Sequence, residues 1–160
     1  AHPSRAVAGL CRQPKGRDVI SFTVPGKPEP WRRSRTNGKR HFKDAKTATN
    51  QLAWGFAARA AMKGSAPLSG PLVATVDAYF PIPKAASKAT RAAMISGQIP
   101  YLPRPDSDNI AKNLDGLNGV AFADDAQIVR LVVSKFYAEA PCVKVRIEPY
   151  VWLAKIGTPA

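Results

Sequence analysis

The segment from residue 142 to residue 152 alternates between apolar and charged side chains. The alternation runs in the order Val143, Lys144, Val145, Arg146, Ile147 and Glu148. Successive side chains of a β-strand point to opposite faces of a sheet, so this pattern predicts a strand with one buried face and one wet face. The chain must therefore fold around a sheet that packs on its core from one side.

Periodicity and turn residues predict the other secondary structure elements. Strands are expected over residues 18–24, 71–80 and 128–137, and helices over residues 44–63, 87–95 and 109–117. The order β, α, β, short α, α, β, β predicts a single small α+β domain. We expect a mixed β-sheet of about four strands packed with two main helices.

Particular residues mark the spacing, the caps and the connections of these elements. The spacing of Leu52, Phe56 and Ala60 marks the first helix, and Asp44 is a plausible N-cap for it. Asp108 is expected to cap the helix over 109–117. We also expect a long basic loop over residues 27–43. The last two strands are expected to form a hairpin that turns near Pro141.

Length and composition indicate one globular unit with a basic N-terminal extension and a short C-terminal tail. Residues 1–17 mix Ala, Gly, Pro and Arg without a period, which predicts a flexible basic extension; residues 18–153 form the domain and 154–160 a tail. No apolar run approaches the roughly 20 residues of a membrane span, and no signal sequence is evident, so we expect a cytoplasmic protein. With two Cys and two His, no zinc-binding spacing occurs.

The charge of the chain is large and uneven. Its formal net charge is +13, and twelve of the twenty-four Lys and Arg residues lie between Arg5 and Lys46, against three acids. A basic segment of this kind indicates a nucleic-acid partner. An anionic membrane surface is the weaker alternative, because the segment contains no evident basic amphipathic helix.

Five of the eleven acidic residues fall within twenty positions, namely Asp106, Asp108, Asp115, Asp124 and Asp125. Carboxylate oxygens are hard ligands that suit Mg²⁺, and the surrounding cations suit phosphate. The combination predicts a metal-dependent nuclease. An EF-hand loop starting at Asp106 is excluded, because Ala111 replaces its Gly and Leu117 its bidentate Glu.

The spacing of the acids suggests how they converge. Asp106 and Asp108 are expected to project to the same side of an extended segment, with Lys112 one helical turn further along. The pair Asp124 and Asp125 follows a chain reversal and can close the site. Taken singly, Asp108, Asp124 and Asp125 also have a structural interpretation as cap or turn residues. Asp115 pairs with Lys112, is solvated on the helix, or lies behind the ligands.

The stretch RPDSDNIAKNLDGLNGVAFADDAQIV resembles the acidic core of RusA-type crossover-junction endodeoxyribonucleases, the Holliday junction resolvases of bacteria and their prophages. Residues 19–28 and 82–91 resemble the family's opening strand and the segment before its core, so the resemblance covers about 18 to 150. It implies a RusA-like fold and Mg²⁺, replaceable by Mn²⁺, with Asp106, Asp108 and Asp125 as metal-binding catalytic carboxylates. Lys112 takes the position of the catalytic lysine, and Asp124 is a further candidate ligand.

The resemblance further implies a homodimer that resolves four-way DNA junctions by paired symmetric nicks in recombination and repair. One departure matters: the helix after Asp108 is one residue shorter than the family pattern, so Asp115 does not align with the family's helix acid. Two alternatives therefore stay open. One is a branched-DNA-binding module that does not cut, and the other is a basic RNA-binding protein with a structural ion site.

The expected DNA contacts lie in two segments. The residues are Lys27, Trp31, Arg32, Arg33, Arg35, Lys39, Arg40, Lys84, Lys88, Arg91 and Arg104. Guanidinium groups suit phosphates, and Trp31 among them is expected to stack on an unpaired base. The alternative for Trp31 is that it packs on the protein core.

Overall fold

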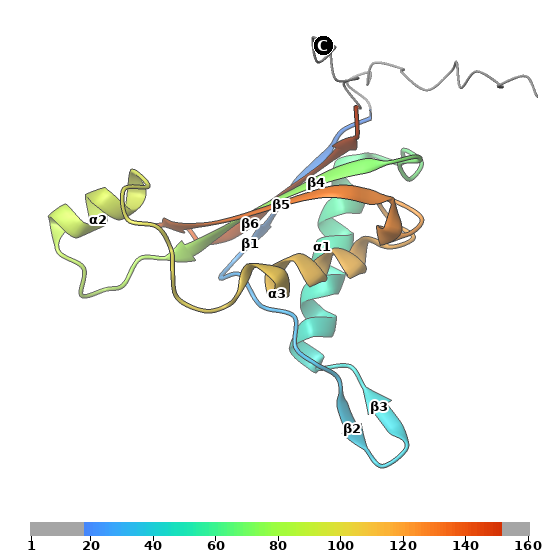
Figure 1. Ribbon diagram of the computed structural model, residues 1–160, viewed down its shortest axis with the longest axis horizontal. Helices are drawn as coiled ribbons and strands as arrows, with labels where there is room; N and C mark the ends of the chain where they lie inside the picture. Colours follow the sequence, from blue (N-terminus) through green and yellow to red (C-terminus); the bar gives the residue numbers. More distant parts are fainter. Residues whose placement is uncertain (1–17, 152–160) are drawn as a thin grey trace, which may run out of the picture.

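The computed structural model describes residues 18–151, so the expectations for 1–17 and 154–160 lie outside the described residues. A four-stranded sheet with strand order β1-β6-β4-β5 forms the centre of the domain (Figure 1). Its strands are β1 (Ile20–Pro25), β4 (Leu72–Pro81), β5 (Ile128–Ala138) and β6 (Cys142–Pro149). β6 pairs antiparallel with β1 and β4, whereas β5 runs parallel to β4. The mixed sheet of the predicted α+β domain is confirmed.

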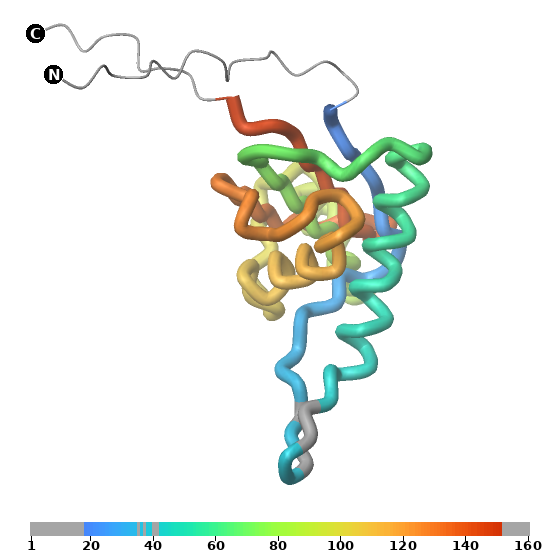
Figure 2. Tube along the Cα trace, turned by 90° about the vertical axis from the view of Figure 1, so that its right-hand side faces the viewer, coloured from blue at the N-terminus to red at the C-terminus, as the bar shows by residue number. Residues whose placement is uncertain are grey.

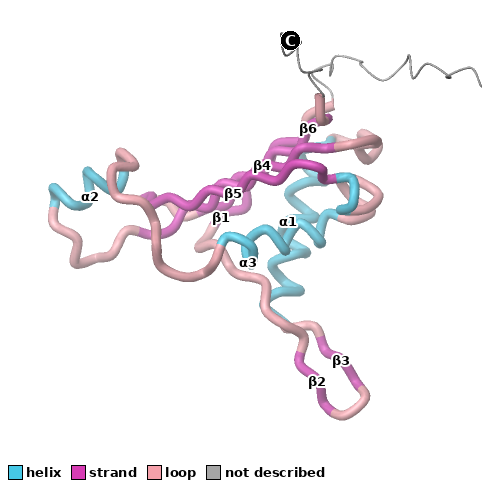
Figure 3. Tube along the Cα trace, in the orientation of Figure 1, coloured by secondary structure: helices cyan, strands magenta, loops and turns pink. Residues whose placement is uncertain are grey.

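One face of the sheet carries the core. The predicted alternation in β6 holds, since Val143, Val145 and Ile147 are buried and Lys144 and Arg146 are exposed. Helices α1 (Ala45–Met62) and α3 (Ser107–Ala111) lie on the buried side (Figure 3). The sheet therefore has the one-sided character that the sequence predicts.

The predicted hairpin between the last two strands is wrong. β4 lies between β5 and β6, with Val76 paired to Val133 on one side and to Val145 on the other. Every second side chain of β4 is buried and the intervening ones are mostly half-buried. This strand therefore buries the most side-chain surface when it lies at the centre of the sheet. The hairpin was predicted because β5 and β6 are adjacent in the sequence. Burial across the whole sheet decides which strand is central, and this places β4 between them.

Helix α1 begins as expected, and Trp54 marks its buried face. Asp44 Oδ1 accepts hydrogen bonds from the backbone amides of Lys46 and Thr47, each at 3.1 Å. Leu52 and Phe56, whose spacing marked the helix, are exposed by 62% and 65%. The fully buried Trp54 packs against Phe22 of the sheet, so the face of α1 that carries Trp54 meets the core.

The segment 27–43 contains more structure than the predicted loop. Strands β2 (Arg35–Asn37) and β3 (Arg40–Phe42) form an antiparallel hairpin that extends from the N-terminal end of α1 (Figure 2). Three-residue strands are too short for an alternation to be recognised. Helix α2 (Lys88–Ile95), predicted from the sequence, lies at the far end of the sheet from this hairpin (Figure 1).

The helix that follows the acidic core starts earlier than predicted. α3 begins at Ser107 with Asp106 in the N-cap position, so Asp108 lies in the first turn and does not cap the helix. The chain then changes to a 3₁₀-helix, η1 (Lys112–Leu117), and a second short one, η2 (Asp125–Gln127), precedes β5.

Among the helices within residues 18–151, none has both the length and the apolar character that a membrane-spanning helix needs.

Candidate active site and nucleic-acid interface

A cavity of about 360 Å³, here called the acidic cavity, lies between the α3–η1 segment and the start of β5. Its lining residues are Asp108, Ala111, Lys112, Leu114, Asp115, Asp125, Ile128 and Leu131. The three carboxylates come from three short helical segments, α3, η1 and η2. The fold therefore collects acids that are up to seventeen residues apart along one wall.

Lys112 is held on three sides at the edge of this cavity. Its Nζ donates to Asp108 Oδ2 at 3.1 Å and to Asn109 Oδ1 at 3.2 Å, and it lies 5.3 Å from the centre of the Trp31 ring. The hydrogen bond from Lys112 lowers the pKa of Asp108. Trp31 is itself fixed, because its backbone amide donates to the Asn109 carbonyl at 2.7 Å. The expected adjacency of Asp108 and Lys112 is therefore observed.

Asp115 and Asp125 both line the acidic cavity. Burial and the neighbouring Asp125 carboxylate raise the pKa of Asp115, and Lys43 and Lys112 partly oppose this. Two carboxylates in such proximity repel unless a proton or a cation lies between them. The sequence analysis set Asp115 aside from the ligands, but the structure places it in the wall of this cavity.

Asp106 faces a different cavity, here called the basic cavity, of about 510 Å³. Its lining residues are Lys27, Pro28, Glu29, Pro30, Trp31, Arg32, Lys46, Arg104, Pro105, Asp106 and Asn109. The expectation that Asp106 and Asp108 project to the same side does not hold. Because the helix begins at Ser107, their positions differ by roughly 200° around its axis instead of alternating along an extended strand.

The carboxylates do not form a ready-made metal centre. Within residues 18–151, no three His, Cys, Asp or Glu side chains are close enough to share one metal ion. The donor chemistry still suits a hard divalent cation, because the acidic cavity offers carboxylate oxygens and no His or Cys. A cation would also relieve the repulsion between Asp115 and Asp125. The residues present therefore fit Mg²⁺ by donor type.

Asp124 has a structural role next to this site. Its Oδ1 accepts from the Ala126 amide at 2.8 Å, and Gln127 Oε1 accepts from the Asp124 amide at 3.2 Å, which together make a capping box. Gln127 Nε2 donates to the carbonyls of Leu68 and Gly70. The cap interpretation that the sequence left open describes Asp124, and this capped turn holds the neighbouring Asp125 at the cavity.

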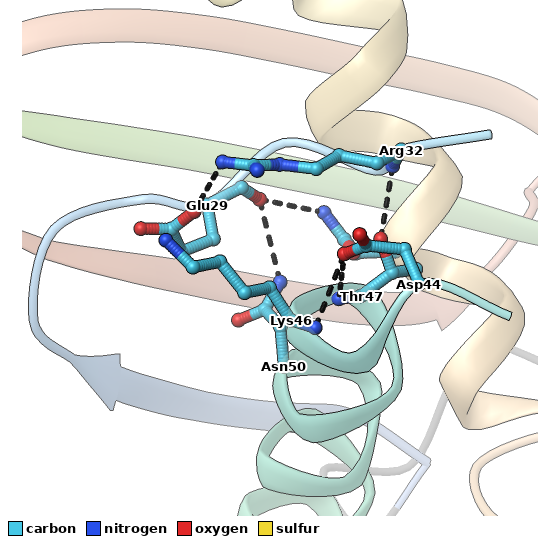
Figure 4. Close-up of polar contacts among 7 residues, drawn as sticks. Glu29, Arg32, Asp44, Lys46, Thr47 and Asn50 are labelled. Atoms are coloured by element: carbon cyan, nitrogen blue, oxygen red, sulfur yellow. Dashed lines mark hydrogen bonds and ion pairs between the residues drawn. The ribbon is translucent and has the colours of Figure 1, made fainter. Parts of the chain in front are cut away.

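The loop that lines the basic cavity is fixed to two helices (Figure 4). The Arg32 amide donates to Thr47 Oγ1 at 2.9 Å. The Glu29 carbonyl accepts from Asn50 Nδ2 at 3.3 Å and from Asn113 Nδ2 at 3.0 Å. Asn50 belongs to α1 and Asn113 to η1. The cations of this loop are thereby held at a fixed place next to the carboxylates.

The predicted DNA-binding residues divide between two ends of the molecule. Four of them, Lys27, Trp31, Arg32 and Arg104, line the basic cavity. Arg33 and Lys39 are exposed before and within the β2–β3 hairpin, and Arg35 and Arg40 belong to its strands. The remaining three residues, Lys84, Lys88 and Arg91, lie on or before α2 at the opposite end. Trp31 packs against Lys112, which places it between the two cavities.

Two lysines that the sequence did not single out also belong to this region. Lys46 lines the basic cavity. Lys135 Nζ donates to the carbonyls of Pro103 and Pro105, each at 3.1 Å, and so supports the loop that leads into Asp106. Lys46 could have been suggested by its place in the first turn of a helix, but the strand position of Lys135 gave no such signal.

Known proteins resemble this chain over most of its length. The family model described as Endodeoxyribonuclease RusA matches residues 25–148. The Uncharacterized protein YqaN of Bacillus subtilis (strain 168) is 35% identical over 136 residues, which cover 81% of this chain and 96% of YqaN. The matched region contains both cavities, all of β4 and β5, and β6 up to Glu148, whereas only the last residue of β1 falls within it. The chain belongs to the RusA family of endodeoxyribonucleases, enzymes that act on DNA.

Proposed function

We propose that this protein resolves four-way DNA junctions by nicking two strands in a reaction that requires Mg²⁺. The observation that carries the proposal is the Asp108–Lys112 pair, joined at 3.1 Å, which shares one cavity with Asp125. These are three of the four positions that match the catalytic residues of the family. The adjoining basic cavity supplies the cations that a DNA backbone requires.

The residues proposed to hold Mg²⁺ are Asp106, Asp108 and Asp125. A bound Mg²⁺ supplies an activated water and polarises the scissile phosphate. Asp108 and Asp125 face the acidic cavity already, whereas Asp106 faces the basic cavity and its side chain has to turn toward them. The low pKa of Asp108 keeps this carboxylate ionised and able to bind a cation at neutral pH.

Lys112 is proposed to act on the phosphate that is cut. Its ammonium group is oriented by Asp108, Asn109 and the Trp31 ring before any DNA is bound. A preorganised cation of this kind stabilises the negative charge that develops on phosphoryl oxygens in the transition state. The position of Lys112 between the two cavities suits this role, because the phosphate backbone crosses from the basic cavity to the acidic one.

Paired nicks on a four-way junction require two active sites. A C2 homodimer offers two sites related by the same symmetry as the junction. We therefore propose that the active form is a homodimer. Sedimentation or light scattering of the free protein and of its junction complex would measure the stoichiometry.

The test of the proposed function is a cleavage assay on a synthetic four-way junction, with Mg²⁺ and with a chelator. Linear duplex DNA and structured RNA serve as competitors in a parallel binding assay. We expect symmetric nicks that require Mg²⁺ and preferential binding of the junction. Tight binding without nicking would leave the branched-DNA-binding alternative, and preference for RNA would overturn the proposal.

A further inference from the structure

We propose that the outer edge of β5 is the surface through which two copies of this chain pair, strand to strand, across a two-fold axis. This inference rests on the proposed function, because it names the interface of the proposed homodimer. The starting observation is that β5 lies at the end of the strand order β1-β6-β4-β5. Among the described residues 18–151, the backbone of β5 pairs with β4 and with no other segment.

The side chains of β5 are unlike those of an edge strand that faces water. Four large apolar residues of this strand are exposed by 38% to 56%, namely Val129, Leu131, Val132 and Phe136. A long edge strand of this kind is a template for another strand, and natural proteins usually shield it with charges, proline or a bulge. The irregularity in the β4 register lies at the start of β5, and the pairing is regular from Arg130 to Ala138. Most of this edge is therefore unshielded.

The other edge of the same sheet has the features that β5 lacks. β1 is only six residues long, and its exposed residues are Ser21, Thr23 and Pro25. The apolar side chains of β1 are buried in the core instead. A short edge with polar side chains and a terminal proline disfavours the addition of a further strand. A second copy is therefore expected at β5 and not at β1.

The two-fold axis determines which side chains of the two strands lie opposite each other. An axis perpendicular to the sheet pairs the strands antiparallel and keeps the same face of each copy on the same side, so opposed residues share a face. Lys135 is in register with the buried Ala78, which places it on the core face. Arg130 is in register with Val73 and lies on the open face. Arg130 of one copy therefore does not lie opposite Lys135 of the other.

The charges of β5 suit a second copy of the same strand. Full overlap of the eleven residues of β5 centres the pair on Val133. Arg130 then lies opposite Phe136, and Leu131 lies opposite Lys135. An arginine beside an aromatic ring is a favourable contact, whereas like charges directly opposite each other would be destabilising. Pairing of the two identical edges also leaves neither of them open to a further strand.

This pairing brings the two acidic cavities to one side of the dimer. Ile128 and Leu131 of β5 line the acidic cavity. Helices α1 and α3 lie on the same side of the sheet (Figure 3), and the two-fold axis keeps this side common to both copies. Because Leu131 lies opposite Lys135, the two Leu131 residues are four positions apart along the strands, or roughly 14 Å. Two neighbouring cavities on one side suit paired nicks in one junction.

The experiment measures the mass of the protein in solution by sedimentation equilibrium over a range of concentrations. Val129→Lys combined with Val132→Lys adds two cations at the edge of β5 and leaves the lining of the acidic cavity unchanged. The control is Leu52→Lys combined with Phe56→Lys, the same kind of change on the exposed apolar residues of α1. We expect the unaltered protein and the control to have twice the chain mass of 17.2 kDa. The dimer dissociation constant of the β5 variant should rise roughly 100-fold.

Hydrogen exchange of the unaltered protein gives a second measurement that needs no substitution. The backbone amides of β5 should exchange more slowly at concentrations at which the dimer forms. Normal dimerisation of the β5 variant, or new protection on α1 instead of β5, would overturn this interface and leave the proposed homodimer intact. An unaltered protein that stays monomeric with and without a junction would overturn both, whereas its nicking activity is decided separately by the cleavage assay.

Discussion

The two cavities on either side of α3 have opposite charge and differ in how they are built. The acidic cavity gathers its carboxylates on short helical segments packed against the core. The basic cavity is formed by an extended loop and by the entrance to α1. Lys112 and Trp31 stand where the two meet. We therefore propose that DNA affinity and bond cleavage belong to separate parts of the surface.

The largest loss of nicking activity is expected from a substitution in the acidic cavity. Asp108→Asn removes a proposed ligand and the partner of Lys112, so nicking should fall by roughly 10³-fold or more. Junction affinity should change little, because the cations that hold the backbone lie elsewhere. Nicking and gel-shift affinity are measured side by side. Full activity of this variant would break the assignment of chemistry to the acidic cavity.

The role of Lys112, which lies between the two cavities, is tested by the substitution Lys112→Ala. If the ammonium group acts on transition-state charge, the rate at saturating protein should fall by roughly 10²-fold while affinity is retained. Single-turnover kinetics at several protein concentrations separates the two quantities. A variant that binds poorly but cuts normally at saturation would assign Lys112 to the basic cavity instead.

The basic cavity is tested by replacing Lys27, Lys46 and Arg104 together with Ala. All three side chains are exposed and line this cavity. Each lost phosphate contact should reduce the slope of log affinity against log salt by about 0.7 to 0.9. The control replaces Lys144 and Arg146, exposed on the opposite face of the sheet. Equal losses in both variants would mean that the DNA does not follow the basic cavity.

The packing under the acidic cavity is tested by Gly116→Ala. The added methyl group would meet the Gln51 backbone at 2.7 Å, so η1 has to move away from α1. Overpacking of this kind costs about 1 to 3 kcal/mol of unfolding free energy. Denaturant unfolding measures it, with Gly70→Ala as a comparison at a position that has open space but a positive φ of +77°. A stability equal to that of the unaltered protein would show that the close approach is not rigid.

The smallest expected effect is a gain in the thermal stability of the metal-free protein when Asp115 is replaced by Asn. The size of this gain depends on pH. The pKa of Asp115 is raised in the folded protein, so its charged form is disfavoured there and the penalty appears as pH rises above about 3.9, the unfolded value. The variant should melt about 1 to 2 °C higher near pH 7, and the difference should vanish at pH 3.5. Melting curves at both pH values decide this. A variant that melts lower at pH 7 would contradict the repulsion.

The sequence predicted the fold where the signal was local. Alternation in β6 and the Asp44 cap of α1 are confirmed, because each depends on neighbouring residues. The pairing of β5 with β4 was missed, since strand order depends on burial across the sheet. The exposure of Leu52 and Phe56 was not predicted, because the spacing of apolar residues locates a helix without fixing which of its faces packs on the sheet.

Prediction of the candidate site from the sequence also succeeds only where the signal is local. The adjacency of Asp108 and Lys112 follows from α-helical spacing and is observed. The orientation of Asp106 depends on the residue at which the helix begins. It differs from the expectation by about one residue of helical phase. Sequence periodicity does not resolve a shift of that size.

The most direct test of the separation between the cavities compares two variants in one assay, single-turnover nicking of a four-way junction over a range of protein concentrations. The variants are Asp125→Asn and the Lys27, Lys46 and Arg104 triple replacement. We expect Asp125→Asn to bind the junction normally and not to cut it. The triple variant should bind weakly and cut at the normal rate once saturated. Loss of binding in Asp125→Asn, or loss of the saturated rate in the triple variant, would contradict the separation.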